Sequence, residues 1–470
     1  MTSRGPDTPP APGRRPAAGQ SPGSDTSGFR HGLRAFQHRD FRLFFIGALA
    51  SNTGNWIQNL AVPFVLFELT GQALWVGLAS FAQFIPAFLL GPVGGWLADR
   101  MDRRRLLLIS QFLMAVAASA LWASWAVGWR NPALILALTA LTGIFSGLMI
   151  PSWQAFVPSL VPRVDLPSAI TLNSTQFNAS RALGPALAGV LLGTAGAGLA
   201  FFLNVVSFLA VIGMLWIIRP EHGRRGSPGG ATAGTAGPGG PGGAEDEGVL
   251  AAFRSALGYI SKRTGIMVGI ASAMLAAFFG NPVTQFTVVF GEDVYDAGPT
   301  VVGLLASAIG IGAVLIAPFL STWDGRIPRS VIVRWGLPLY GLAVMAFGAS
   351  PNWPTGLLAL FAVGAGFLAV ISTTNTSVQM IVADEMRGRV MSTRVMGFTL
   401  AFPVGSLIQG ALADWIGPRT TVIGAGGCLV VAALVLATRP ATLATLDHED
   451  DTPDRSGLRS GLVDRGDDRP

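Results

Sequence analysis

The feature that most constrains this chain is its series of long apolar segments, each separated from the next by a short polar connection. A helix needs about 20 apolar residues to cross roughly 30 Å of hydrocarbon. Twelve segments reach this length, at residues 41–67, 74–98, 105–127, 132–152, 168–194, 198–218, 265–290, 299–321, 330–349, 355–378, 390–414 and 420–438. Because lipid offers the backbone no hydrogen-bond partners, each segment is predicted to be an α-helix.

The composition supports an all-α membrane protein. Only 12% of the 470 residues are charged and 50% are hydrophobic, whereas soluble domains average about 25% charged residues. The mean hydropathy of +0.51 indicates that many segments lack a polar face for water. Arginine outnumbers the single lysine, Lys262, and Ala, Gly and Pro are abundant, which is typical of a GC-rich bacterial genome. We therefore expect a multi-pass protein of a bacterial inner membrane.

The sequence offers little material for covalent chemistry. Its single cysteine, Cys428, excludes an intrachain disulfide and a cysteine-based metal site. The four histidines form no cluster, and no phosphate-binding motif of the G-x-x-x-x-G-K-[ST] kind is present. We expect no enzymatic activity, no metal and no cofactor.

Positive charge is distributed unevenly between the two sets of connections. The stretch GGWLADRMDRRR, residues Gly94–Arg105, ends the second apolar segment in a block of charges, and most other arginines near segment ends lie on the same side. The opposite connections carry mainly Arg130 and Arg419. Since short loops rich in arginine and lysine stay in the cytoplasm, both termini are predicted to be cytoplasmic. We attribute the net charge of +6 to these cytoplasmic loops, and no nucleic-acid partner is expected.

The two halves of the chain resemble each other. The motif NWIQ at Asn55–Gln58 matches NPVTQ at Asn281–Gln285, and GQALWVGLAS from Gly71 matches GPTVVGLLAS from Gly298. Repeats of this kind predict two pseudo-symmetric six-helix bundles with a substrate site between them near the middle of the membrane. The predicted organisation is a disordered cytoplasmic tail (1–40), a first bundle (41–220), a cytoplasmic linker (221–264), a second bundle (265–440) and a disordered cytoplasmic tail (441–470).

The predicted linker has two parts. Residues His222–Gly248 are rich in Gly and Pro and show no apolar period, which is typical of a flexible connection. The following residues place Leu250, Phe253, Leu257 and Ile260 on one helical face. They predict an amphipathic helix on the inner membrane surface.

The charged loop carries a resemblance to a known family. GGWLADRMDRRR resembles the signature G-x-x-x-D-R-x-G-R-R of the major facilitator superfamily, with Gly95, Asp99, Arg100, Arg103 and Arg104 at matching positions. Asp102 replaces the usual glycine. ITLNSTQFNASRALGPALAG (Ile170–Gly189) and RGRVMS (Arg387–Ser392) resemble the branch that contains enterobactin-type siderophore exporters and macrolide-type efflux proteins.

The resemblance implies a secondary transporter that exports a small amphipathic molecule by alternating access, with protons as the coupling ion. It also implies that Asp99 acts as a cytoplasmic latch against the start of the eleventh helix, supported by Arg103 and Arg104. The alternative is that the arginines only anchor the topology. A monomer is expected.

The fifth apolar segment carries a packing motif. Ser180, Gly184 and Ala188 lie at four-residue spacing, which permits close helix packing, and Pro185 adds a point where the helix can bend. Together with Gly189, this stretch resembles part of the glycine–proline motif of family antiporters and therefore favours export. Plain close packing explains the same pattern.

Several polar residues lie inside apolar segments, where they should face water, substrate or another helix. Arg181 shares a helical face with Ser174 and Asn178. It either binds an anionic substrate or forms a structural contact between helices. The predicted cavity residues, each of which could instead join helices, are Asn52, Asn55, Gln58, Asn59, Gln83, Asn178, Arg181, Asn281 and Gln285.

The sequence shows no deep carboxylate. Glu68, near the outer end of the first segment, is the candidate for proton coupling, and the alternative is an ordinary interface charge. Two other functions stay open at this point. One is import of a nutrient or an iron chelate, and the other is a membrane scaffold or sensor that transports nothing.

Overall fold

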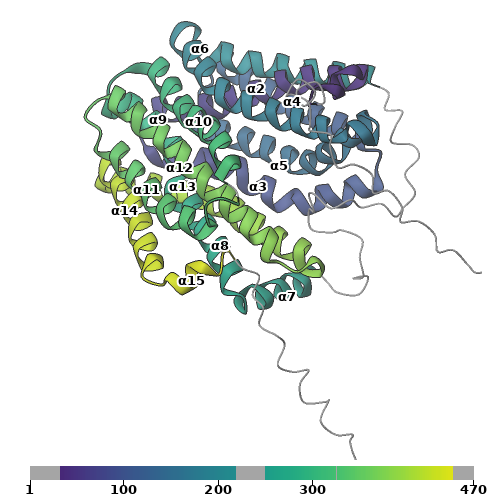
Figure 1. Ribbon diagram of the computed structural model, residues 1–470. Coiled ribbons are helices and arrows are strands. Elements are labelled where there is room, and N and C mark those ends of the chain that lie inside the picture. Colours follow the sequence, from purple (N-terminus) through teal and green to yellow (C-terminus); the bar gives the residue numbers. More distant parts are fainter. Residues whose placement is uncertain (1–31, 219–248, 324, 448–470) are drawn as a thin grey trace, which may run out of the picture.

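The structure, a computed structural model, describes residues 32–218, 249–323 and 325–447, and every regular element within these ranges is a helix (Figure 1). The all-α prediction is therefore confirmed for the described residues. Most of the two predicted tails and the Gly/Pro-rich part of the linker lie outside the described residues.

The first set of helices comes from residues before 219. It begins with α2 (Arg39–Thr70) and α3 (Ala73–Arg100), followed by α4 (Arg103–Ala126) and α5 (Pro132–Phe156). After two short 3-10 turns, η2 (Val157–Leu160) and η3 (Arg163–Asp165), the chain forms α6 (Leu166–Ile217). Gly196 divides α6 because its φ of 75° and ψ of 174° are not helical. This break separates the predicted segments 168–194 and 198–218.

The second set starts with a helix interrupted by π turns. It runs through α8 (Thr264–Leu275), η4 (Ala276–Gly280), α9 (Val283–Val289) and η5 (Phe290–Val294). Pro282 has no N–H to donate, and the Asn281 amide bonds five residues back to Ala276 at 3.0 Å. The remaining helices are α10 (Gly298–Trp323), α11 (Arg329–Ala349), α12 (Trp353–Ile381), α13 (Asp384–Ile416), α14 (Pro418–Ala437) and the short α15 (Pro440–Ala444).

Ten helical stretches in the described part of the chain are long and apolar enough to cross a membrane, by length and composition alone. The stretch Arg163–Ile217 has 55 residues, about 80 Å if straight, whereas a bilayer core is about 30 Å thick. Gly196 lets it fold back on itself. The 32-residue α2 is not among the ten. The number of crossings, twelve, stays a prediction.

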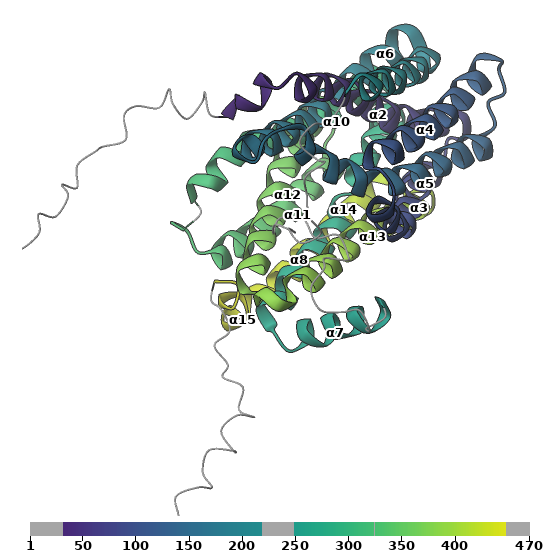
Figure 2. The same ribbon diagram turned by 90° about the vertical axis from the view of Figure 1, so that its right-hand side faces the viewer.

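Each set packs mainly within itself, and two pairs of long helices make most of the contact between the sets. In the first set α2 lies along α6 and α3 along α5, and in the second α10 lies along α12 and α11 along α14. The purple-to-blue helices thus occupy one side of the molecule and the green-to-yellow helices the other (Figures 1 and 2). The joining pairs are α3 with α13 and α6 with α10.

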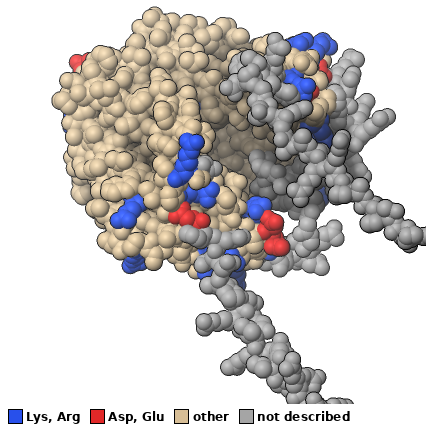
Figure 3. All heavy atoms as spheres, viewed as in Figure 1, with Lys and Arg blue, Asp and Glu red and all other residues tan. Residues whose placement is uncertain are grey.

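The helices place the connections at two ends, which we name by their residues. The basic end holds the connections near Arg103, Arg163, Arg263 and Arg326, and the Asp414 end holds the opposite connections. The surface is hollowed at the right of the view in Figure 3, beside the grey residues.

The predicted tails are shorter than expected. Arg34–Gln37 form a 3-10 helix, and α2 begins at Arg39. The amide of Ala35 donates to Ser168 Oγ at 3.1 Å, so this segment is tied to the start of α6. At the other end α15 continues the fold, and Leu443 and Leu446 are buried. The tail boundaries at 40 and 441 are corrected accordingly, because apolar residues near these boundaries find partners in the bundle.

The predicted amphipathic helix is present as α7 (Val249–Ser261). Ile260 of its predicted apolar face is buried, whereas Phe253 and Leu257 are exposed, and the side chain of Leu250 is not described. The Tyr259 hydroxyl accepts a hydrogen bond from the amide of Ala383 at 3.2 Å. The helix, which lies at the edge of the molecule in Figure 2, therefore packs its far end against the start of α13. Phe253 and Leu257 stay uncovered by the described residues.

Glycines set the distance between α10 and α12. A Cβ added at Gly364 would overlap the carbonyl oxygen of Ile309, and one added at Gly312 would overlap that of Phe361. A Cβ added at Gly427 on α14, by contrast, would meet no atom within 4 Å. The two helices can lie this close only without side chains at these points.

Gly364→Ala is expected to lower stability by about 1–3 kcal/mol, because the new methyl group must push α10 away from α12. The measurement is the thermal unfolding midpoint of the purified protein in detergent. Gly427→Ala is the matched control and should raise the midpoint slightly, since alanine favours a helix over glycine. An equal midpoint for both variants would contradict the tight contact.

Candidate functional site

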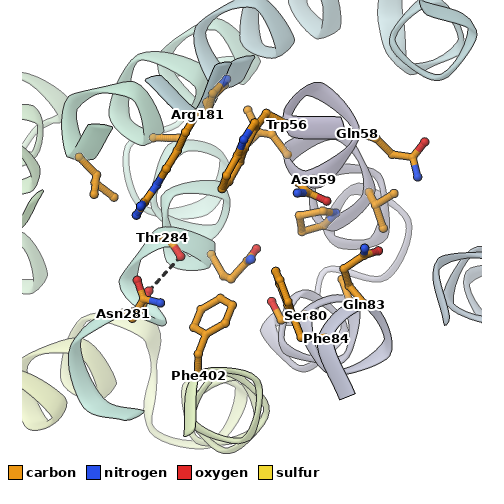
Figure 4. Close-up of a pocket in the computed structure, with 18 of the residues that line it drawn as sticks. Trp56, Gln58, Asn59, Ser80, Gln83, Phe84, Arg181, Asn281, Thr284 and Phe402 are labelled. Atoms are coloured by element: carbon orange, nitrogen blue, oxygen red, sulfur yellow. Dashed lines mark hydrogen bonds between the residues drawn. The ribbon is translucent and has the colours of Figure 1, made fainter. Parts of the chain in front are cut away.

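A cavity of about 310 Å³ lies between the two sets of helices. The first set contributes side chains from α2, α3, α5 and α6, and the second from α9, α10, α12, α13 and the turn before α9. Both polar and aromatic side chains surround it (Figure 4). The lining residues include Trp56, Gln58, Asn59, Ser80, Gln83, Phe84, Thr139, Arg181, Pro185, Asn281, Thr284, Gln285, Phe367, Phe398, Thr399 and Phe402.

Six of the nine predicted cavity residues contribute to this lining. Gln58 and Asn59 come from α2, and Gln83 comes from α3. Asn281 and Gln285 come from the interrupted helix of the second set, so the repeated motifs NWIQ and NPVTQ face the same space. Arg181 is the sixth. One pair of matching positions, Gln58 and Gln285, therefore lies in the lining of the same cavity.

Arg181 is the one charged side chain among the described residues that line the cavity. Its guanidinium carbon lies 5.9 Å from the centre of the Trp56 ring, within the range of a cation–π contact. Figure 4 shows the side chain extending from α6 toward the space bounded by Thr284 and Asn281. Since no carboxylate is among the described residues that line the cavity, the charge that they present to this space is positive.

Gln58 serves mainly as a structural residue. Its Oε1 accepts a hydrogen bond from Asn204 Nδ2 at 2.6 Å, and Ser207 Oγ donates to Asn204 Oδ1 at 3.1 Å. Asn204 is completely buried. The amide of Gln58 points away from the centre of the cavity in Figure 4. This cluster joins α2 to the second arm of α6.

Three predicted cavity residues are absent from the lining, and this corrects the prediction. Asn52 Nδ2 donates to Gln176 Oε1 at 3.2 Å, which joins α2 to α6. Asn178 is exposed and donates to the carbonyl of Ser174 at 2.9 Å on its own helix. Asn55 is half-buried and also lies outside the lining. One helical face of α2 is shared between the cavity and α6.

Aromatic side chains form much of the remaining wall, and the sequence analysis missed most of them. Phe84 of α3 and Phe402 of α13 meet edge to face, with ring centres 5.3 Å apart. Phe367 and Phe398 lie 6.3 Å apart on α12 and α13. Among the lining rings, only Trp56 belongs to a motif described from the sequence, the repeat NWIQ. Their apolar segments gave no signal, because lipid-facing and cavity-facing aromatics have the same spacing.

The predicted packing motif, which lies in α6, closes the Asp414 end of the cavity. A Cβ at Gly189 would lie 2.7 Å from the Cα of Gly303 on α10, and one at Gly184 would overlap Trp56. Pro185 lines the cavity, and Ser180 Oγ accepts a hydrogen bond from Thr53 Oγ1 at 3.1 Å. The predicted packing motif thus contacts both α2 and the second set.

The predicted latch residues lie at the basic end. A Cβ at Gly95 would meet no atom within 4 Å, and Asp99 is exposed, with no hydrogen bond or ion pair to another described residue. Arg100 stacks over Trp96 at 4.1 Å. The two sets are therefore apart near these residues, and a latch involving Asp99 stays a prediction.

The arginines of the loop bind within their own set. Arg103 donates to the carbonyl of Ala155 at 3.2 Å, at the end of α5. Arg104 donates to the carbonyls of Leu215 and Trp216 at 2.7 and 2.8 Å, at the end of α6. Cations stabilise helix C-termini, where carbonyl groups lack partners. These two residues hold together the helix ends of the first set.

Asp102, which replaces the glycine of the superfamily signature, has a local role. Its Oδ1 accepts a hydrogen bond from the amide of Arg105 at 2.9 Å and caps the start of α4. An aspartate is a favoured N-cap residue. The departure from the signature therefore strengthens the turn.

Two further charged groups complete the description. Arg394 of α13 is buried and donates to Asn375 Oδ1 at 2.8 Å and to the carbonyl of Ile371 at 3.3 Å. The sequence analysis did not single it out, although it lies ten residues inside α13. Glu68 is exposed near the end of α2 and does not line the cavity. Among the described residues no group of His, Cys, Asp and Glu could hold a metal ion.

Long apolar helices around a central polar cavity, closed at one end and separated at the other, define a multi-pass membrane transport protein. The chain matches the family described as transmembrane secretion effector over residues 31–464. It therefore belongs to this family of major facilitator transporters, which confirms the resemblance seen in the loop and in α6.

Individual relatives agree with this family. The staphyloferrin A transporter of Staphylococcus aureus is 25% identical, over 80% of this chain and 90% of its own. Macrolide efflux protein A of Streptococcus pyogenes is 20% identical, over 84% of this chain and 94% of its own. Among solved structures, a POT family transporter in complex with 5-aminolevulinic acid matches with a TM-score of 0.66 at 14% identity, over 86% and 97% of the two chains. The last match shows the fold.

A cysteine at Asn281 is expected to react with a water-soluble thiol reagent, because this position faces a cavity that water can enter. The background is Cys428→Ala, which removes the native thiol. Asn204→Cys is the control, and its completely buried position should stay unmodified until the protein is denatured. The measurement is the mass shift of the purified protein over time. Modification of both positions at one rate would contradict the cavity.

Proposed function

We propose that this protein exports a small amphipathic molecule with an anionic group across a bacterial inner membrane by alternating access. The observation that supports it most is Arg181, a cation beside Trp56 in a cavity whose described lining has no carboxylate. A buried cation in a membrane protein costs several kcal/mol unless a partner or water compensates it. A substrate carboxylate or catecholate would supply that compensation, while the aromatic wall takes the apolar part.

The topology proposed for the membrane has twelve crossings in two bundles, residues 41–220 and 265–440. It counts α2 as one crossing and the two arms of α6 as two. The basic end is assigned to the cytoplasm, together with both termini, because arginines concentrate there. The substrate then enters the described cavity from the cytoplasm. A monomer suffices, since the cavity is built from one chain.

The direction proposed is export. Gly184, Pro185 and Gly189 resemble part of the antiporter motif, and one relative carries the word efflux in its name. The substrate classes considered are a drug, an antibiotic or a siderophore, and the name of the staphyloferrin A transporter favours a chelator. An importer of a nutrient or iron chelate is the second candidate. A scaffold or sensor that transports nothing would not need a cavity that is closed at one end and open at the other between two bundles.

Protons are the proposed coupling ion, by resemblance to family antiporters. No carboxylate lies among the described lining residues, so a coupling group in the first bundle must lie elsewhere. Glu68 is the candidate, at the end of α2. Proton binding at Glu68 would then be coupled to substrate transport through the movement of the two bundles.

Arg181→Gln is expected to weaken transport of an anionic dye by about 1.5–3 kcal/mol, or roughly ten- to a hundredfold in apparent affinity, because a charge-assisted contact is lost. An uncharged amide of the same dye should be affected much less. Arg181→Lys keeps the charge and serves as the control. Protein level is checked in each strain. Equal losses for both dyes would leave Arg181 a structural role only.

Direction is tested by retention of the anionic dye in cells with and without an uncoupler. Export predicts that expression lowers retention and that the uncoupler restores it. Higher retention on expression would support import instead. No change in either condition, with protein present in the membrane, would support a scaffold.

A further inference from the structure

We infer that Asp414 is an outer latch: its carboxylate caps the start of α3 from the opposite bundle and holds the Asp414 end closed. This inference rests on the proposed alternating access. It adds a positioning residue that the superfamily signature in the loop after α3 does not contain.

The contact of Asp414 joins two elements far apart in the chain. Its Oδ1 accepts from the amide of Ala73 at 2.7 Å, and its Oδ2 accepts from the amide of Leu74 at 2.9 Å. Both amides belong to the first turn of α3, which has no intrahelical partners for them. The helix has no side-chain cap of its own, since Gln72 makes no capping bond, and its first turn has no acidic residue. Asp414 therefore supplies the cap from outside.

Glycines beside the cap keep the two helices in contact. A Cβ at Gly410 would lie 2.7 Å from the carbonyl oxygen of Ala73, and one at Gly77 would lie 2.9 Å from the Cα of Leu407. Gly410 lies one helical turn before Asp414. The cap and the close approach thus form one unit at the end of α13.

The same unit occurs once more, at the end of α3. The sequence Gly95-Trp96-Leu97-Ala98-Asp99 repeats the pattern G-x-L-A-D of Gly410-Ala411-Leu412-Ala413-Asp414. Each aspartate lies in the last turn of its helix, four residues after the glycine. Because the start of α3 contacts the end of α13, these paired helices are antiparallel. The end of α3 therefore lies at the same end of the molecule as the start of α13.

The two units are in opposite states in this structure. Gly410 and Asp414 contact the start of α3, whereas a Cβ at Gly95 would meet no atom within 4 Å and Asp99 has no bond to a described residue. The start of α13 also lacks a side-chain cap from its own N-cap residue, Ala383. Alternating access would break the Asp414 cap as the outer end opens, and would bring Asp99 to the start of α13 as the inner end closes.

The two caps differ in strength. The first turn of α13 carries Asp384 and Glu385, whereas the first turn of α3 carries no acidic residue. A carboxylate stabilises a helix N-terminus, and nearby carboxylates reduce that gain. Asp414 therefore gains more from its helix than Asp99 does. This asymmetry favours the state seen here, which is closed at the Asp414 end.

The experiment measures the two ends separately in the purified full-length protein without substrate. Pairs of spin labels at Val127→Cys with Thr420→Cys, and at Val164→Cys with Arg326→Cys, report the Asp414 end and the basic end in a Cys428→Ala background. Asp414→Ala is expected to raise the ratio of open to closed Asp414 ends about fivefold, the value of a typical lost cap. Asp414→Asn keeps one acceptor oxygen and should give a smaller shift in the same direction.

Two further variants, a single control and a double variant, test whether the effect is specific to the Asp414 cap. Asp293→Ala removes another exposed carboxylate at this end and should leave both distance distributions unchanged. Asp99→Ala added to Asp414→Ala should return the ratio toward that of the wild type, because both caps are then absent. If Asp414→Ala and Asp414→Asn lower the unfolding midpoint but leave both distributions as in the wild type, Asp414 is an ordinary helix cap and the latch is refuted. Because no transport is measured, this result would be independent of whether the export proposal holds.

Discussion

The close approach of two backbones, at Gly189 of α6 and Gly303 of α10, is the constraint on which the rest of this structure depends. A Cβ at Gly303 would lie 2.6 Å from the carbonyl oxygen of Pro185, so these positions admit no side chain while the helices stay together. In lipid, small-residue packing and hydrogen bonds replace the hydrophobic effect as the cause of helix association. The contact joins the two bundles at one end and leaves them free to separate at the other.

The cavity and its chemistry follow from this one-sided closure. The amides of Asn281 and Gln285, together with Arg181, would be costly in hydrocarbon, and the space between the two sets of helices gives them water or substrate as partners. The single cation in the described lining would favour an anionic substrate under the proposed function, and the aromatic side chains would contact its apolar part. This combination suits a transporter that binds amphipathic anions and releases them after the closed end opens.

The sequence predicted the helices well because segment length and hydrophobicity alone decide whether a stretch can cross lipid. It predicted Asn281 and Arg181 in the cavity because a polar group inside an apolar segment must face inward. The sequence does not distinguish a polar residue that faces the cavity from one that faces another helix. Asn52 shares its helix with cavity residues but bonds to Gln176. The partners of Asp102, Asp414 and Phe402 lie on other elements or in the local turn geometry, and the period of one helix contains no information about them. Arg394 was overlooked for a simpler reason: it lies only four residues after the start of the predicted segment 390–414, close to the charged residues that precede that segment.

The most direct test of the account is a cross-link between the bundles at the closed end. The Cβ of a residue at Gly193 would lie 2.6 Å from Thr300 Oγ1, so cysteines at Gly193 and Thr300, in a Cys428→Ala background, come within reach of a disulfide. The account predicts that oxidation forms this disulfide within one chain, that transport stops, and that a reductant restores it. A cross-linked protein that transports at the uncrosslinked rate would contradict alternating access through this end.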